Sequence, residues 1–580
     1  MLYGQSRHDN QGHDEVKTLK VGFLVDGLKV SSYIHDLVKH VSDCPQFDDP
    51  VILTGHCLPA QPKSLKDKIR SAFEDKKIKD MLQSRAIDYL IGLTRKLERK
   101  NLKKNKPCHF NTFNLESFSE ISVVKLEGEW SKSKLFLSFS PQQVQKIKGQ
   151  NLDCIIRCGS GILKGDVLEA STFGILSFHH GDNRVNRGGP SGFWEVLYDQ
   201  PSSGFIIQQL SNELDGGKVL VRGNIMTRSN WMENNAVLLI KSNFFMKKLL
   251  DDIAKNRALP EEEDPSLHDH PLLKLDSVTP IVKYLYKVHA KLVKQRVMSK
   301  LFGPDIVRWS VAFSAHDNFK KSLWRYKEIE NPDGRFLADP FVFTHNDRTL
   351  LFVEDYFYAE QKGKVSAYEI VEGELVNHGV ILEEPFHLSF PFVFEANDKV
   401  YMIPESHSAN EIRLYECIDF PLKWRFKKTL MDNVSAADTM LLQDNDRWYM
   451  FTNICSAGTS DHHSELHIYW SEQFDSQSWT PISSGNPVIF DSERARNGGF
   501  FKHNECLFRI NQIHDKNHYG KAFGINKVSK LSADEYVETR VKDVYPNFKP
   551  DLDSTHHFNA NETIAVIDYC RNVKYKTVKK

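Results

Sequence analysis

The sequence predicts an α/β domain with a parallel sheet, followed by an all-β domain. Three observations predict this order. Nearly continuous apolar runs that end in Gly-containing loops occur in the first part, hairpin-like units repeat in the second, and the length of 580 residues with 40% hydrophobic residues suffices for two or three cores. We expect an α/β domain over 19–230, a helical connector over 231–304 and the β domain over 305–580.

The composition limits the classes of partner. Acidic and basic residues number 76 each, so no overall charge favours nucleic acid, and we expect no nucleic-acid partner. The nine cysteines form no close C-x-x-C pair, which favours reduced thiols over disulfides or a zinc site, and we expect no metal. The first residues lack the apolar core of a signal peptide, and no apolar run reaches the ~18 residues needed to span a bilayer, which predicts a cytoplasmic protein.

Two apolar runs indicate buried strands of the α/β domain. The run "LKVGFLVDG" from Leu19 closes on Asp-Gly, as a buried parallel strand does when it enters a loop. The run "NLDCIIRCGSGIL", residues 151–163, enters a Gly-Ser-Gly turn at 159–161. Open α/β sheets bind ligands at the carboxyl ends of their strands, so these loops are candidates for a site.

A basic segment interrupts this domain at residues 62–107. It holds fifteen Lys or Arg residues and six Asp or Glu residues, and it predicts a helical insertion. Its apolar stripe either packs against the domain or lies at a membrane surface among anionic lipid headgroups. The stripe comprises Met81, Leu82, Ile87, Leu90, Ile91, Leu97 and Leu102.

The stretch "GILSFHHGDNRVNRGGPSGFWEVL", residues 174–197, concentrates two histidines and an Arg-Gly-Gly-Pro turn between apolar runs. It predicts a strand that enters a loop and then a helix. The next segment, 203–225, places Leu-Asp-Gly-Gly between two strand-like runs. The Asp215 carboxylate either caps its own turn or reaches the same crevice as His179.

These segments, over about residues 19–230, resemble the folate-dependent formyltransferase family. The family pattern of Asn-x-His, Arg-Gly and Leu-Asp-x-Gly falls on 177–179, 187–188 and 214–217. The resemblance implies a Rossmann-type parallel sheet and N10-formyltetrahydrofolate as co-substrate. It assigns catalytic roles to Ser177, His179 and Asp215, and cofactor contacts to Gly159, Gly161, Arg187 and Gly188.

Formyl transfer explains why these residue types belong together. The reaction passes through a tetrahedral oxyanion while one amine loses a proton and the other gains one. His179 would carry the proton and Asp215 would orient the imidazole. This sequence has Ser177 where the family has Asn, and losing such an amide donor costs about 3 kcal/mol in comparable sites. Either His180 or Asn183 supplies the donor, or the site binds without catalysis or runs a related reaction.

The second half repeats one plan. After the acidic, Pro-rich stretch "ALPEEEDPSLHDHPLLKLD", which reads as a solvated hinge, five units recur at intervals of about forty to sixty residues. Each has an apolar strand, an Asn/Asp turn and a second apolar strand, which is typical of hairpins. Together they predict a five-bladed β-propeller. The units are "ADPFVFTHNDRTLLFVED", "SFPFVFEANDKVYMIPES", "AADTMLLQDNDRWYMFTN", "RNGGFFKHNECLFRINQ" and "HHFNANETIAVIDYC".

These units resemble the arabinanase-like propellers of glycoside hydrolases and, more closely, the N-terminal domain of plant glucosamine inositolphosphorylceramide transferases. The resemblance places Asp339 at the position of a hydrolase base. The second blade has Ser-Phe-Pro where the hydrolases have Asp, which favours a sugar-recognising funnel over a hydrolase. In a third interpretation, the carboxylates at the blade entries only form hydrogen bonds with the ends of the blades. The other candidate funnel residues are Glu354, Glu405, Asp438, Arg496, Arg509 and Gln512.

Two functions follow from these resemblances. The first is an N-formyltransferase that acts on an amino sugar or nucleotide sugar of a surface glycan or glycolipid, with the propeller presenting the glycan. The alternative is a non-catalytic α/β domain with a glycan-binding or divergent glycosidase or glycosyltransferase-associated propeller. Methionyl-tRNA formylation ranks third, because the neutral net charge gives no tRNA footprint. If the stripe of 62–107 lies at a membrane surface, this segment would make peripheral contact with the inner face of the membrane.

Overall fold

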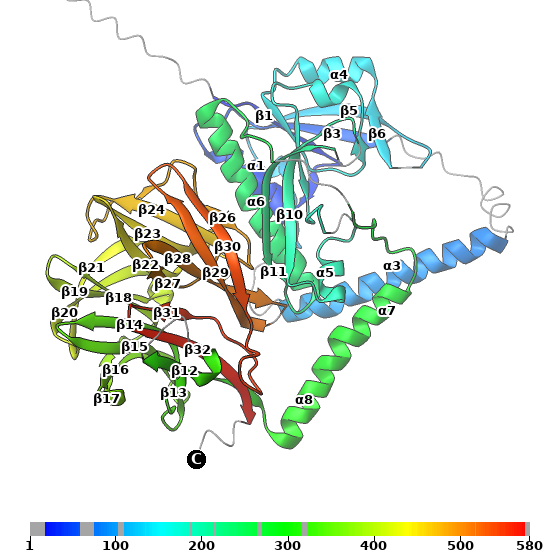
Figure 1. Ribbon diagram of the computed structural model, residues 1–580. Helices are drawn as coiled ribbons and strands as arrows, with labels where there is room; N and C mark the ends of the chain where they lie inside the picture. The colour runs from blue at the N-terminus through cyan, green and yellow to red at the C-terminus, as the bar shows by residue number, and fades with distance from the viewer. Residues whose placement is uncertain are drawn as a thin grey trace, which may run out of the picture.

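The computed structural model describes residues 18–57, 75–102, 110–133, 135–185, 188–213, 216–263, 269–315, 322–516 and 518–574. The chain forms two bodies, an α/β domain and a β-propeller, which lie against each other and are joined by a long helix (Figure 1). Among the described residues, no helix combines the length and apolar character needed to cross a membrane.

The α/β domain is built on a nine-stranded sheet with the order β11-β10-β9-β7-β1-β3-β5-β6-β8. The five central strands, from β9 to β5, run parallel, whereas β10 pairs antiparallel with β9 and β11, and β6 pairs antiparallel with β5 and parallel with β8. The sheet is therefore mixed, not purely parallel as predicted. The strands are β1 (Val21–Val25), β3 (Val51–Cys57), β5 (Ser122–Trp130), β6 (Phe136–Phe139), β7 (Cys154–Arg157), β8 (Ile162–Leu163), β9 (Ile175–His179), β10 (Ser202–Gln209) and β11 (Lys218–Met226).

Helices cover both faces of this sheet. In β1 all five residues are buried, and alternate side chains point to opposite faces, so Phe23 packs under α1 and α6 while Leu24 packs under α4. The smaller elements include the β2–β4 ribbon and the short helix α5. Their bounds are α1 (Ser32–Asp43), α4 (Pro141–Lys148), α5 (Phe193–Tyr198), α6 (Trp231–Asn256), β2 (Lys29–Ser31), β4 (Thr112–Asn114), and the 3-10 turns Leu115–Ser117 and Asp166–Glu169.

Helix α6 belongs to the core of the α/β domain, although its sequence was assigned to the connector. Its apolar face, which includes Val237, Met246 and Leu250, joins the same core cluster as β1 and α1. A helix that packs on a sheet and a helix that merely connects domains share the same periodicity, so the pattern alone does not separate them. The described part of the acidic stretch that follows is held at several points: Arg222 donates to Glu263 at 2.7 Å, Lys218 pairs with Glu262 at 3.3 Å, and Leu273 packs against the cluster around Trp231.

The basic segment forms α3 (Asp75–Leu102), and the rest of the predicted stretch lies outside the described residues. One face of α3 packs against α6 and α7 and buries Ile87 and Glu98. Glu98 accepts hydrogen bonds from the Met232 backbone N–H at 2.9 Å and from the Tyr284 hydroxyl at 2.6 Å. Part of the predicted stripe is therefore buried, but Leu82 and Leu97 stay exposed; nothing is described for the Met81 side chain.

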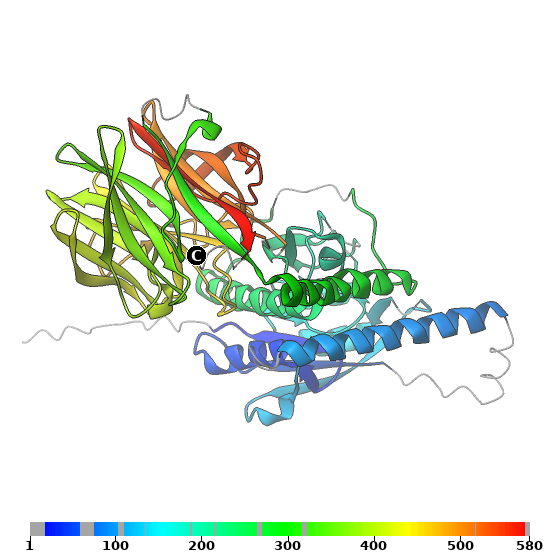
Figure 2. The ribbon, with the colours of Figure 1, turned by 90° about the horizontal axis from the view of Figure 1, so that it is seen from below.

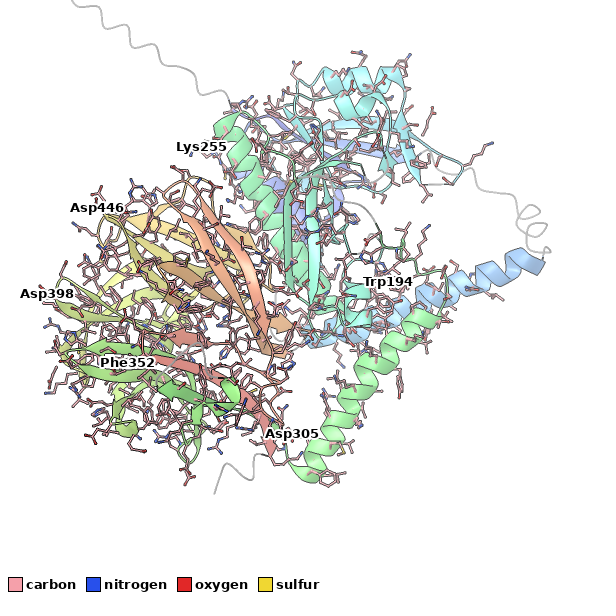
Figure 3. All side chains as sticks on the ribbon, viewed as in Figure 1. Trp194, Lys255, Asp305, Phe352, Asp398 and Asp446 are labelled. Atoms are coloured by element: carbon pink, nitrogen blue, oxygen red, sulfur yellow. The ribbon has the colours of Figure 1, made fainter. Side chains whose placement is uncertain are left out.

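A single long helix leads from the α/β domain to the propeller. It comprises α7 (Thr279–Leu285), one π-helical turn (Tyr286–Ala290) and α8 (Lys291–Phe302). Figures 1 and 2 show it as a rod that ends at the first propeller strand. Asp305, labelled in Figure 3, marks the start of that strand, β12 (Asp305–Ala315).

The β domain is a five-bladed propeller, as predicted. Four blades each use consecutive strands, and the fifth is closed when β12, from the start of the domain, pairs along its whole length with β32 from the end. The first blade comprises β14 (Arg335–His345), β15 (Arg348–Phe357), β16 (Lys362–Val371) and β17 (Glu374–Leu382), and the second comprises β18 (Ser389–Ala396), β19 (Lys399–Glu405), β20 (Glu411–Asp419) and β21 (Lys423–Asp432). The third comprises β22 (Ala436–Asp444), β23 (Arg447–Ile454), β24 (Glu465–Ser471) and β25 (Thr480–Pro481), with β26 (Ile489–Phe490) paired to β24, and the fourth comprises β27 (Asn497–His503), β28 (Cys506–Asp515), β29 (His518–Leu531) and β30 (Tyr536–Val544). The fifth comprises β31 (Phe558–Ala560), β32 (Ile564–Lys574), β12 and β13 (Lys327–Glu328). Two 3-10 turns, Leu323–Arg325 and His407–Ala409, also lie in the β domain.

The predicted hairpins also form. Asn397 and Asp398 both adopt positive φ, as a tight hairpin turn requires, and Asn346 and Asp347 do the same in the first blade. Figure 3 shows Asp398 and Asp446 on the side of the propeller away from the α/β domain. The opposite ends of the innermost strands therefore face the α/β domain and the long helix.

Candidate functional site

A β-bulge interrupts the innermost strand at the same place in four blades. The bulges follow Ala338, Ser389, Ala437 and Asn497. In the first three blades the extra residue is Asp339, Phe390 and Asp438, with φ of 49°, 45° and 49°. A bulge re-aims a side chain, and non-glycine residues held at positive φ cluster at functional sites. The repeat thus gives two blades a buried carboxylate and one a buried aromatic ring.

Asp438 lies in an ionic network with Arg496 and Glu405. Arg496 donates to Asp438 through Nε at 2.6 Å and to Glu405 through an Nη atom at 3.4 Å. Gln512 donates to the same Asp438 oxygen at 2.9 Å. Burial opposes ionisation of Glu405, but its hydrogen bond from His407 and the Arg496 charge outweigh burial and hold the pKa of Glu405 well below its usual range. Burial, reinforced by Glu405 and opposed by Arg496, raises the pKa of Asp438.

Asp339 lies in a second network with His556 and Asp568. His556 Nε2 is 3.3 Å from Asp339, and its Nδ1 is 2.8 Å from Asp568. Burial disfavours the imidazolium, but the two carboxylates outweigh burial and raise the pKa of His556 to about 10. The ligand atoms of these three residues lie within 4.8 Å of one another, which is close enough for a metal ion. With His556 protonated, its imidazolium places a positive charge between the two carboxylates.

Glu354 differs from the other carboxylates in its ionisation. It is buried next to His387, whose Nε2 lies 3.4 Å away. Burial, together with the Asp339 and Glu405 carboxylates, raises the pKa of Glu354 well above its ordinary value. The His556 contact works in the other direction on Asp339: despite burial, it lowers the pKa of that carboxyl. The cluster therefore contains buried carboxyls whose pKa values are shifted in opposite directions.

A cavity of about 920 Å³ lies above this cluster, between the propeller and the long helix. On the propeller side it is lined by Trp309 and Tyr519. Trp309 packs on His556 with ring centroids 4.1 Å apart, and Arg496 lies 5.2 Å from the centre of the Tyr519 ring. The two aromatic rings thus separate the cavity from the carboxylates. The opposite wall consists of Asp199, Ser229, Lys287, Val288, Lys291, Leu292 and Gln295.

The structure brings together six of the seven funnel residues selected from the sequence: Asp339, Glu354, Glu405, Asp438, Arg496 and Gln512. Arg509 does not join them. It is fully buried within its own blade and donates to Glu538 at 2.7 and 2.8 Å. Sequence reasoning missed His407, Trp309 and Tyr519, as well as His556, although His556 precedes the innermost strand of its unit just as Asp339 lies at the start of its own.

The α/β site is only partly described. The Gly159–Gly161 turn follows β7, and the backbone N–H and hydroxyl of Ser160 donate to Asp26 at 2.8 and 2.6 Å. His179 ends the neighbouring strand β9, so both lie at the carboxyl edge of the parallel strands, as expected. Arg187 and Asp215 lie outside the described residues.

Several residues of the predicted formyl-transfer site have other roles. The Ser177 hydroxyl is buried; it accepts from Arg157 at 3.2 Å and donates to the Phe178 carbonyl. Both candidate replacements for the missing donor are also engaged, His180 with Ser242 at 3.0 Å and Asn183 with Arg222 at 2.9 Å. Burial lowers the pKa of His180 to about 4.

Gly188 was assigned to the approach of a cofactor. The structure shows that its missing side chain makes room for the chain itself, because a Cβ there would lie 1.9 Å from the Leu273 carbonyl oxygen. At Gly161 a Cβ would lie 2.7 Å from the Trp130 ring, and φ is +82°. Both glycines are thus required by packing within the protein.

Comparisons with known proteins match the propeller. Residues 326–559 match the family described as "Glucosamine inositolphosphorylceramide transferase 1, N-terminal". The Arabidopsis thaliana protein named glucosamine inositolphosphorylceramide transferase 1 is 32% identical over 212 residues, which cover 36% of this chain and 27% of that protein. The Oryza sativa subsp. japonica protein of the same name is 32% identical over 211 residues, 36% of this chain and 28% of its own length. The chain thus spans about a quarter of these relatives.

Solved structures give weaker likenesses. A thermostable family-43 glycoside hydrolase matches 42% of this chain and 91% of its own, with 15% identity and a TM-score of 0.33. A glycinamide ribonucleotide transformylase 1 from Symbiobacterium toebii matches 44% and 95%, with 11% identity and a TM-score of 0.26. Values of this size assign no function to either body. The family match supports the resemblance of the repeated units, and it does not extend to the α/β domain where we expected a formyltransferase.

Proposed function

We propose that the propeller binds the sugar-containing headgroup of a glycolipid in the cavity between its mouth and the long helix. The observation that carries this proposal is the convergence of buried carboxylates, Arg496 and two aromatic rings beneath one cavity of about 920 Å³. Ligand pockets of small molecules have volumes of this order, and the walls of this cavity combine the rings of Trp309 and Tyr519 with many polar and charged side chains. The names of the relatives suggest the ligand class, a phosphoinositol headgroup attached to a ceramide.

The cavity walls suit both parts of such a headgroup. The flat faces of Trp309 and Tyr519 offer stacking surfaces for a sugar or inositol ring. Lys287 and Lys291 line the helix side and Lys516 lines the propeller side; a phosphate would be attracted to them and would compete with Asp199, which pairs with Lys287 and Lys516. Burial lowers the pKa of Lys516, and Lys287 and Lys291 add to this effect while the Asp199 carboxylate opposes it.

Binding of soluble headgroup fragments to the full chain tests this proposal. Isothermal titration would compare inositol 1-phosphate with unphosphorylated inositol. Lys291→Ala should weaken inositol 1-phosphate by about tenfold, the value of one charge-assisted hydrogen bond, and leave inositol unchanged. Trp309→Phe should weaken both ligands, because it reduces the stacking surface.

Lys423→Ala is the matched control, since Lys423 is exposed on the outer strand of the second blade. The proposal is wrong if Lys291→Ala and Trp309→Phe bind both ligands as the wild type and the Lys423→Ala control do. It is also wrong if the wild type binds neither inositol 1-phosphate nor inositol at millimolar concentration.

A second candidate function is glycoside hydrolysis, and one observation favours it. Environments that push the pKa values of two carboxyls apart separate a general acid from a base, and here Glu354 is raised while Asp339 is lowered. Release of nitrophenol from a panel of nitrophenyl glycosides would reveal this activity. Glu354→Gln should abolish it and Glu369→Gln, on the neighbouring strand, should not. Absence of release from every substrate rejects this second function.

Formyl transfer at His179 ranks below both. Formyl transfer requires a hydrogen-bond donor for the oxyanion. The three candidate donors, Ser177, His180 and Asn183, instead form hydrogen bonds inside the domain in this structure. We also propose an amino sugar as a further substrate, on the basis of the names of the relatives. Calorimetry with a folate analogue tests the formyltransferase alternative directly, and measurable binding would restore it.

A further inference from the structure

The long helix that roofs the cavity carries positive charge and no negative charge. Over residues 279–302 the sequence contains six basic side chains and no Asp or Glu. Every one of the 12 residues of α8 is at least partly accessible, and none is buried, in a segment that the structure describes completely. The basic residues are Lys283, Lys287, Lys291, Lys294, Arg296 and Lys300.

The outer face of α8 combines this charge with exposed apolar side chains. Val293, Val297 and Leu301 recur at intervals of four residues, so they form one stripe along the helix, and they are 59%, 48% and 68% exposed. Arg296 and Lys300 flank the stripe on one side and Lys294 on the other. Tyr286, at 76% exposed, and Val282 continue the exposed apolar surface toward the α/β domain. A helix surface of this kind in water leaves apolar area unburied, which marks an interaction site.

We propose that the outer face of the α7–α8 helix docks on an anionic lipid surface. Charge complementarity selects this occupant, because Lys294, Arg296 and Lys300 on this face have no Asp or Glu beside them on the helix and favour phosphate or carboxylate headgroups. The alternation of apolar and basic side chains matches helices that lie in the interfacial plane of a membrane. The described helices include none that spans a bilayer, so this contact would be peripheral.

The same helix lines the proposed headgroup cavity with its inner face. Lys287, Lys291, Leu292 and Gln295 point to that side, whereas Val293, Val297 and Leu301 lie on the opposite side. Only one helix diameter, about 10 Å, separates the two. Docking would therefore hold the cavity next to the lipid surface. The docking itself does not depend on glycan binding, so either proposal can fail while the other stands.

Co-sedimentation of the full chain with large vesicles tests the docking. The wild type should bind vesicles of phosphatidylcholine with phosphatidylserine, bind pure phosphatidylcholine far more weakly, and release at high salt, where charges are screened. Arg296→Glu/Lys300→Glu should weaken binding to anionic vesicles by about 30-fold, at about fivefold for each basic residue lost. Val293→Ser/Val297→Ser/Leu301→Ser should also reduce binding, and at high salt as well as at low salt.

Matched controls separate the helix from general surface effects. Lys502→Glu/Lys542→Glu changes two exposed propeller lysines, and Val371→Ser/Val376→Ser/Val380→Ser removes apolar surface of similar exposure from the first blade. Both controls should bind vesicles as the wild type does. Equal binding by the α8 variants and the controls overturns the proposal. It is also overturned if the serine variant changes the oligomeric state in ultracentrifugation while vesicle binding stays the same, because the face would then be a protein interface.

Discussion

Lys241 of α6 carries the main ionic contact between the two bodies, and its replacement by methionine should destabilise the protein strongly. The Lys241 ammonium contacts Glu465 and lies 3.5 Å from Asp461, and all three side chains are completely buried. The attraction keeps both carboxylates ionised: despite burial, Lys241 lowers the pKa of Asp461 and of Glu465. Methionine keeps the length of the side chain and removes its charge. Removing one partner of a buried ion pair costs about 3–5 kcal/mol, because the remaining charge stays desolvated.

Lys247→Met provides the matched control on the same helix. Lys247 pairs with Asp36, whose side chain is 55% exposed, and exposed pairs contribute only about 0–1 kcal/mol. Urea unfolding followed by tryptophan fluorescence would compare the midpoints of the two variants. The charge-balanced variant Lys241→Met/Asp461→Asn/Glu465→Gln should recover most of the loss. If Lys241→Met and Lys247→Met cost the same, or if the balanced variant recovers nothing, the electrostatic reasoning is refuted.

Three further predictions address the fold and the site. The pKa of His556 is about 10 in the folded state and 6.5 in the unfolded state, so protonation of His556 stabilises the fold by up to about 5 kcal/mol. This stabilisation is complete below pH 6.5 and is lost as the pH rises through 10. Urea unfolding midpoints measured between pH 6 and 10 should show the loss in the wild type and not in His556→Gln. Phe390→Asp should lower the free energy of unfolding in urea by at least about 3–5 kcal/mol, because it removes a buried aromatic ring and buries a carboxylate near Asp339. A loss above about 1.5 kcal/mol for Phe390→Leu would contradict the packing argument. Asn230→Ala should cost about 1 kcal/mol in the same assay, since the side chain accepts from the Glu233 N–H at the start of α6, and an equal cost for Asn230→Asp would argue against capping.

The propeller could be predicted because its signals are local. Each hairpin is encoded by two apolar runs around a turn such as Asn397–Asp398, whose positive φ only a few residue types accept readily. The mixed character of the α/β sheet could not be predicted in this way. The direction of β6 and β10 depends on which strands they meet across the sheet, and a period of two is the same in parallel and antiparallel strands.

The site shows the same division between local and distant signals. Asp339 and Asp438 could be selected because both occupy the same place in a repeated unit. Arg509 was selected wrongly, although a local rule argues against it: Arg509 and Gln512 lie three positions apart on β28, and side chains an odd number apart on a regular strand point to opposite faces. Trp309 and Tyr519 come from strands of different blades, so only the closed ring brings them above the carboxylates.

The segment Asp461–Glu465 links the two bodies to the candidate site. At its ends Asp461 and Glu465 hold Lys241 of the α/β domain, and between them His463 Nδ1 accepts a hydrogen bond from Arg496 at 3.2 Å. Burial and the Arg496 charge lower the pKa of His463 well below its ordinary value, so the ring is neutral and its Nδ1 can accept from the guanidinium. Arg496 in turn fixes Asp438 and lies under Tyr519. A shift of α6 relative to the propeller would therefore move His463 and loosen the floor of the cavity. Lys241→Met should accordingly weaken binding of inositol 1-phosphate more than Lys247→Met does, even in conditions where both variants remain folded.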